Sequence, residues 1–244
     1  MPLQTGSAPR KLIPAGTVAE NVAAVRARIE AAARRAGRPP EGVRVVAVSK
    51  GFGPEKIAEA VAAGITDIGE NRLQEALPKV AWLKERGIKV TWHFVGHLQT
   101  NKVKGVLAHF DLIHSVDSVR LAQEISRRAS RPVPVLLQVN VAAELAKGGF
   151  ILEPVLPDRE LFWAAWEVIR RLPNLDIRGL MTIAPQVDDP EKVRPVFRRL
   201  RELAERLGLP ELSMGMTEDY EVAVEEGATM VRLGRAVFGE RPAR

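Results

Sequence analysis

The stretch VRVVAVSKGFGPEKIAEAVAAGITDI, residues 43–68, predicts the architecture of this chain. It begins with an apolar, β-branched run at 43–48, continues through an amphipathic pattern at 54–63, and returns to an apolar run at 65–68. The outer runs are typical of buried strands and the middle segment of a helix. Two strands joined in this way are expected to be parallel, because parallel neighbours need a long crossover connection.

The same strand–helix unit recurs along the rest of the chain. Further β-branched runs lie at 90–94, 112–113, 133–139, 176–181, 211–213 and 229–231. Amphipathic helical patterns separate most of them, at 72–86, 99–108, 118–129, 158–171, 190–207 and 218–225. Eight alternating units in 244 residues favour a single α/β domain, a (β/α)8 barrel of the TIM type. Because the last three strands are short, an open doubly wound sheet is the alternative.

The N-terminal region departs from this rhythm. Residues 1–16 contain three prolines and two glycines with little periodicity, which predicts a flexible tail. From Thr17 an extra N-terminal helix is expected, because Glu20 follows three residues later and completes a capping-box pattern. The barrel domain is therefore expected to span residues 17–244.

Composition excludes several classes of protein. The chain has no cysteine, which excludes disulfides, thiolate catalysis and cysteine-ligated metals. No apolar run approaches the roughly 20 residues that cross a bilayer, and residues 1–14 lack the apolar segment of a signal peptide. We therefore expect a cytoplasmic protein without a membrane partner.

The net charge of +6 and the isoelectric point near 9.9 raise the question of nucleic-acid binding. The basic residues argue against it, because they fall in pairs on separate predicted helices and alternate with glutamates. These pairs are Arg34-Arg35, Arg127-Arg128, Arg170-Arg171 and Arg198-Arg199. The pattern is typical of solvated helix faces, so no nucleic-acid partner is expected.

Polar, ionisable and glycine residues follow the predicted strands, and in this fold such positions meet at one mouth of the barrel. Examples are Lys50, Glu70, Asn71, His97, His114, Asp117, Asn140, Thr182, Thr217 and Arg232. A purely structural barrel does not require this clustering. We therefore expect a ligand site at the mouth.

Lys50 is the sharpest candidate in that set. It comes directly after the first apolar strand and Ser49. Partial burial at a strand end lowers the pKa of a lysine and frees its amine as a nucleophile, which forms Schiff bases with aldehydes. On position alone, a lysine that extends into solvent is the commoner alternative.

A phosphate site is predicted independently of Lys50. Gly215-Met216-Thr217 and Arg232-Leu233-Gly234-Arg235 follow the seventh and eighth strands, each ahead of a helix. Loops at these strands are the recurrent phosphate site of this fold, although ordinary tight turns have the same pattern. A reactive amine opposite a phosphate cradle indicates an aldehyde-bearing phosphate ligand, and pyridoxal 5′-phosphate (PLP) is the common one.

Other chemistry has weaker support. His93 and His97 are four residues apart, but they straddle a strand end and a turn, and no third ligand has suitable spacing, so no metal site is expected. Glu70 is interpreted as capping the following helix in preference to acting as a general base.

Several blocks in order carry a resemblance to a known family. They include AVSK at 47–50, GENRLQE at 69–75, WHFVGHLQTNK at 92–102, HSVDS at 114–118, QVNV at 138–141, RGLMT at 178–182, LSMGMT at 212–217 and VRLG at 231–234. From about Thr17 the chain resembles the pyridoxal phosphate homeostasis proteins, relatives of the alanine racemase N-terminal barrel. The resemblance implies an alanine racemase-like barrel that binds PLP.

The resemblance also implies roles for individual residues. Lys50 corresponds to the lysine that binds PLP covalently, and Arg232 to the arginine that faces the pyridine nitrogen. Thr217, the adjacent Met216 and the backbone around Gly234 correspond to the phosphate site, and Asn71 to a polar neighbour of the cofactor. Thr217 stands where the family usually has serine, which keeps the hydroxyl. Arg235 stands where threonine is frequent, so its contact with the phosphate stays open.

The same resemblance favours a carrier over a catalyst. An arginine at the pyridine nitrogen makes the ring a poorer electron sink, and racemases add a tyrosine from a second domain. Here Tyr220 is the only tyrosine, next to the phosphate loop, and no histidine has an evident orienting partner. We expect a monomeric PLP carrier, buffer or regulator without robust catalysis, with PLP-dependent apo-enzymes or PLP-forming enzymes as partners. The alternative is a PLP-dependent racemase or lyase of weak or narrow activity.

Overall fold

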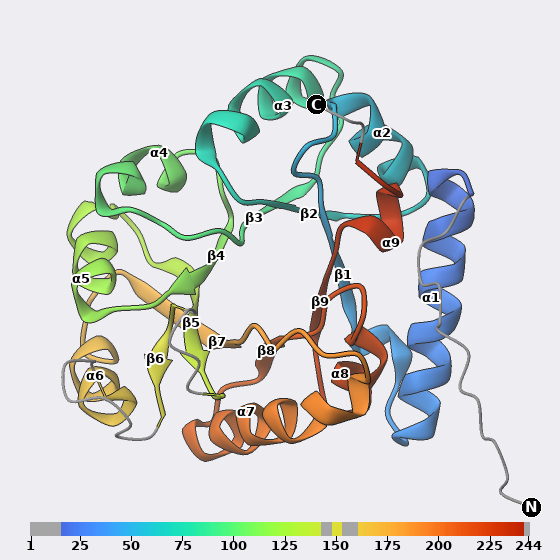
Figure 1. Cartoon of the computed structure of the whole chain (residues 1–244). Helices are drawn as coiled ribbons and strands as arrows, with labels where there is room; N and C mark the ends of the chain where they lie inside the picture. The colour runs from blue at the N-terminus through green and yellow to red at the C-terminus, as the bar shows by residue number, and fades with distance from the viewer. Residues whose placement is uncertain (1–15, 143–147, 153–160, 242–244) are drawn as a thin grey trace, which may run out of the picture.

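The computed structural model describes residues 16–142, 148–152 and 161–241. In these residues eight parallel strands close into a central ring surrounded by helices (Figure 1). The ring consists of β1 (Arg44–Val48), β2 (Asp67–Glu70), β3 (Thr91–Phe94), β4 (Leu112–Val116), β5 (Val133–Asn140), β7 (Leu175–Met181), β8 (Glu211–Ser213) and β9 (Met230–Leu233). Because β1 pairs with β9 and β4 with β5, the predicted barrel is confirmed and the open-sheet alternative is wrong.

Helices follow most of the barrel strands and pack their apolar faces on the ring. They are α1 (Val18–Arg35), α2 (Pro54–Ala62), α3 (Leu73–Glu85), α4 (Val103–Leu107), α5 (Val119–Arg128), α6 (Phe162–Ile169), α7 (Arg194–Leu207), α8 (Tyr220–Glu225) and α9 (Arg235–Phe238). Short 3₁₀ turns lie at η1 (Pro40–Gly42), η2 (Thr100–Lys102) and η3 (Pro190–Val193). The α5 helix is typical, since Leu121, Ala122 and Ile125 recur at helical spacing and are buried.

The predicted extra helix is confirmed as α1. The Thr17 hydroxyl accepts from the Glu20 N–H and the Glu20 carboxylate accepts from the Thr17 N–H, which is the capping box. The helix packs on α8, α9 and α2, and so covers the seam where the first and last strands meet (Figure 1). The predicted tail lies, except for Gly16, outside the described residues.

One strand was not predicted. β6 (Phe150–Ile151) pairs in parallel with Val139 and Asn140 of β5, beyond the point where the pairing of β5 with β7 ends at Gln138. Two apolar residues are too short a run to show strand periodicity. The predicted helix at 158–171 begins outside the described residues, and its described part is α6.

Several residues expected just after a strand lie inside one. Glu70 ends β2, His114 and Ser115 lie within β4, and Arg232 lies within β9. The prediction ended each strand at its last apolar residue, whereas the backbone ladder continues through the polar ones. All four side chains are buried, Glu70 against Lys79 of α3 and His114 in the barrel interior.

The paired arginines lie on helices and bind glutamates, as the charge pattern predicted. Arg127 and Arg128 contact Glu124 on α5, and Arg170 and Arg171 contact Glu167 near the end of α6. Such exposed pairs contribute little to stability. None of the helices in the described ranges is long and apolar enough to cross a membrane.

Candidate functional site

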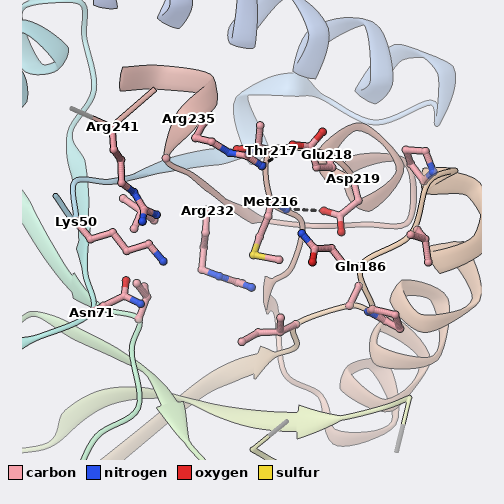
Figure 2. Close-up of a pocket in the computed structure, with 18 residues that line it drawn as sticks. Lys50, Asn71, Gln186, Met216, Thr217, Glu218, Asp219, Arg232, Arg235 and Arg241 are labelled. Atoms are coloured by element: carbon pink, nitrogen blue, oxygen red, sulfur yellow. Dashed lines mark hydrogen bonds and ion pairs between the residues drawn. The ribbon is translucent and has the colours of Figure 1, made fainter. Parts of the chain in front are cut away.

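A cavity of about 320 Å³ opens at the carboxyl ends of the strands. All the residues predicted to bind the cofactor line it, although β1, β2, β8 and β9 supply them from distant parts of the sequence (Figure 2). They are Lys50, Asn71, Met216, Thr217, Arg232 and Gly234. The structure brings these six residues together, whereas Glu70, His97, His114, Asp117, Asn140 and Thr182 do not line the cavity. The binding role of each residue stays a prediction.

Lys50 lies in the turn after β1, and its amine points into the cavity (Figure 2). Its side chain is half-buried, and this burial, together with the nearby Arg241 cation, lowers the pKa of Lys50; Glu75 and Glu70 act in the opposite direction. Within the described ranges its Nζ makes no hydrogen bond or ion pair. A larger share of the amine is therefore uncharged and nucleophilic than in a free lysine.

A buried network holds the turn that carries Lys50. Lys79 Nζ donates to the carbonyl oxygen of Ser49 at 2.9 Å and to Glu70 Oε1 at 2.6 Å, and it also reaches Glu75. The Ser49 hydroxyl donates to Glu70. The interpretation of Glu70 as a helix cap is therefore wrong: it is fully buried and binds Ser49 and Lys79. Burial raises the pKa of Glu70, against the opposing effect of Lys79.

Substitution of Lys79 by methionine is expected to destabilise the fold by about 3–5 kcal/mol, because it leaves the Glu70 carboxylate buried without its cation. Denaturant unfolding measures this difference. Lys56→Met is the matched control, since Lys56 pairs with Glu59 on the surface and its loss should change stability by less than about 1 kcal/mol. Equal effects of the two substitutions would contradict the assigned role of Lys79.

Arg232 brings a buried positive charge to the cavity. Its Nη1 donates to Ser213 Oγ at 2.7 Å and its Nη2 donates to the Thr182 carbonyl oxygen at 2.9 Å. Burial lowers the pKa of Arg232 to about 10, and Asp219 opposes that shift. The guanidinium is therefore still charged at neutral pH. Its other N–H groups have no partner in the described part of the chain and remain available to a ligand.

The loop after β8 has the tight glycine turn expected at this position, whereas its role as an anion cradle stays a prediction. Gly215 has φ +93°, and a Cβ there would lie 2.6 Å from the Ala223 Cβ, so the turn requires glycine. The backbone N–H of Met216 donates to Asp219 Oδ1 at 2.6 Å. The Met216 side chain lies at the cavity (Figure 2). Thr217 is buried beside it and presents a hydroxyl.

The cavity is predominantly cationic. Lys50, Arg232, Arg235 and Arg241 line it, and of these four only Arg235 forms an ion pair within the described residues, with Glu218 Oε1 at 2.7 Å. The proximity of Arg241 was not predicted, because nothing in its local sequence relates it to the turn after β1. Residues 183–187, which follow β7, also line the cavity. The sequence pattern after this strand indicated only Thr182, so these residues were not predicted.

The histidines have partners that the sequence did not reveal. His93 Nε2 binds Asp67 at 2.8 Å, His114 Nδ1 binds Ser213 Oγ at 2.8 Å, and His97 Nδ1 binds Asp117 at 3.1 Å. None of these histidines lines the cavity. The described residues contain no cluster of side chains suited to a metal ion.

Comparison with known proteins identifies the family. Residues 21–242 match the family model of the alanine racemase N-terminal domain. Over 231 residues the chain is 46% identical to the pyridoxal phosphate homeostasis protein of Aquifex aeolicus, covering 91% of this chain and 97% of the relative. The chain belongs to the pyridoxal phosphate homeostasis protein family. The Pseudomonas aeruginosa member is also 46% identical, over 92% of this chain and 96% of its own length.

Solved structures agree with this family assignment. PipY of Synechococcus elongatus PCC7942, determined with PLP bound, is 37% identical with a TM-score of 0.72, covering 91% of this homeostasis-family chain and 100% of PipY. The same protein without PLP superposes with a TM-score of 0.77. Alanine racemase from Corynebacterium glutamicum is 17% identical with a TM-score of 0.65 over 61% of its length, which shows a shared fold alone.

Proposed function

We propose that this chain binds PLP covalently through Lys50 and serves in PLP homeostasis as a carrier, buffer or regulator. The observation that carries the proposal is the convergence of three groups on one cavity. They are the half-buried amine of Lys50, the buried guanidinium of Arg232 and the hydroxyl of Thr217 beside the Gly215 turn. The PLP-bound structure of the relative PipY supports the same ligand.

The residues present fit this cofactor. PLP supplies an aldehyde that condenses with a primary amine, with loss of water, to a Schiff base. Lys50 offers the amine, Arg232 a charged donor for the ring nitrogen, and Thr217 a hydroxyl donor for the phosphate. Asn71 lines the same cavity as a polar neighbour for the ligand.

Among the described residues that line the cavity, none is an evident second acid/base opposite Lys50, which favours a carrier over an enzyme. Tyr220 is buried, and burial raises the pKa of Tyr220 to about 12, so its proton is held firmly at neutral pH. Among the described lining residues, the carboxylates are Glu218 and Asp219. The first is paired with Arg235 and the second accepts from the Met216 N–H.

We further propose that the protein works as a cytoplasmic monomer that exchanges PLP with PLP-dependent apo-enzymes or PLP-forming enzymes. The exposed arginine pairs of α5 and α6 are bound to glutamates, as expected of solvated helix faces.

A transfer assay tests carrier against catalyst. PLP-loaded protein is expected to activate an added apo-enzyme at a measurable rate, while L-alanine, L-serine and D-amino acids show negligible turnover. Lys50→Ala, loaded under the same conditions, should transfer far less PLP. Turnover at an ordinary enzymatic rate of about 1–10³ per second that disappears in Lys50→Ala would instead establish a racemase or lyase.

A further inference from the structure

A chain of hydrogen bonds crosses the barrel interior beneath the cavity. Arg232 Nη1 binds Ser213 Oγ at 2.7 Å, Ser213 Oγ binds His114 Nδ1 at 2.8 Å, and His114 Nε2 binds His93 Nδ1 at 2.9 Å. His93 Nε2 then binds Asp67 Oδ1 at 2.8 Å. We call these five residues the relay. Each comes from a different strand: β9, β8, β4, β3 and β2.

The relay runs from the mouth of the barrel to its floor. Ser213, His114 and His93 are fully buried, while Asp67 lies beside a second cavity of about 510 Å³ at the opposite end of the strands. At that end Arg44 of β1 approaches Asp67 Oδ1 at 3.9 Å and binds Glu211 of β8 at 2.9 Å.

The chemistry of its two ends gives the relay one direction. A guanidinium can only donate, so Ser213 Oγ accepts from Arg232, and the carboxylate at the other end of the chain directs the Ser213 proton toward His114 Nδ1. His114 then carries its proton on Nε2 and donates to His93 Nδ1. His93 in turn donates from Nε2 to the Asp67 carboxylate, which can only accept when ionised. In this direction each imidazole donates from Nε2 and accepts at Nδ1.

This arrangement matters because Arg232 is a buried cation. A buried charge is costly unless it is hydrogen-bonded, and Ser213, polarised by a chain that ends on the Asp67 carboxylate, supplies one acceptor to the guanidinium. Thr182 fixes a second edge of the guanidinium through its carbonyl oxygen. The N–H groups left over then point to the cavity.

We propose that Ser213, His114, His93 and Asp67 are positioning residues that hold Arg232 in one orientation, with its free donors toward the ligand at the barrel mouth. Toward PLP, this inference rests on the proposed function. A proton added to either imidazole would reverse the bond to Ser213 and place a second cation near Arg232. Burial, followed by His93, Arg232 and Arg44, lowers the pKa of His114 well below its usual range, which opposes that reversal.

The direction of the relay can be measured without PLP. Nitrogen NMR of PLP-free protein labelled with ¹⁵N-histidine separates the two tautomers and the cation. At neutral pH, His93 and His114 are both expected to be neutral and protonated at Nε2. An Nδ1–H tautomer at either residue, or a cationic imidazole, would overturn the proposal whatever the protein binds at Lys50.

Variants of Ser213 test the effect on the ligand. Ser213→Ala should mix the tautomers of His114 and weaken PLP binding by about tenfold, as expected when a charged donor loses a partner. Ser213→Thr keeps a hydroxyl and should restore both readouts. Ser126→Ala is the matched control, because Ser126 is a buried serine of α5 outside the relay.

The two readouts separate the failure of each proposal. Unchanged PLP affinity in Ser213→Ala, with Lys50 still carrying PLP in the wild type, would remove the positioning role. Absence of PLP from Lys50 in the wild type would overturn the proposed function, whereas the tautomers would still decide the direction of the relay.

Discussion

Lys50→Ala is expected to abolish the absorbance band at about 420 nm that the wild-type protein gives when it is mixed with PLP, a band typical of a lysine–PLP Schiff base. The physical reason is the state of the amine. Burial and the neighbouring Arg241 lower the pKa of Lys50, and no described side chain binds its Nζ. The amine at the end of β1 therefore has a larger uncharged share than a free lysine and is the nucleophile best prepared to attack an aldehyde in the cavity.

Lysines elsewhere provide the controls for this expectation. Lys79 is the lysine that could compete most directly with Lys50, because it is buried below the same turn. Its ammonium, however, is hydrogen-bonded to Ser49, Glu70 and Glu75. Lys56 is exposed and paired with Glu59. Lys56→Ala should keep the band, and borohydride reduction should attach PLP to Lys50 in the intact protein. A reduced label on another lysine would contradict the assignment.

The fold could be predicted because its strand rhythm is local. The spacing of apolar residues in the run at 43–48 and in the helical pattern at 54–63 shows which face of each element is buried. Only a few topologies can accommodate eight such strand–helix units. The short β6 gives no such signal. It pairs with Val139 and Asn140 because the pairing of β7 with β5 has ended by that point. That relation is set by register between distant strands.

The site could be predicted only in part, for a related reason. Lys50 and Thr217 follow apolar strands, so their place at the mouth follows from the fold. Glu70, His93 and His114 lie inside strands, where an ionisable residue resembles a strand end or a cap. Their partners come from other strands, as when His114 of β4 reaches Ser213 of β8, and only closure of the barrel brings these together.

Removal of the Thr217 hydroxyl is expected to weaken PLP binding by about 1–3 kcal/mol, the cost of losing a hydrogen bond to a charged group. Thr217 is buried in the loop after β8, beside the Gly215 turn. Titration of PLP into Thr217→Ala and wild-type protein measures the difference. Thr217→Ser is the matched control, because it keeps the hydroxyl, and its affinity should stay close to that of the wild type.

Pyridoxal, which lacks the phosphate, isolates the same interaction from the side of the ligand. Wild-type protein should bind PLP much more tightly than pyridoxal, because Thr217 and the loop around Gly234 then have no anion to hold. In Thr217→Ala this preference should shrink by the same factor by which PLP binding weakens. Pyridoxal affinity should stay constant, because the Thr217 hydroxyl is proposed to contact only the phosphate. Equal wild-type affinities for the two ligands would show that the loops after β8 and β9 are ordinary turns and would remove the phosphate site.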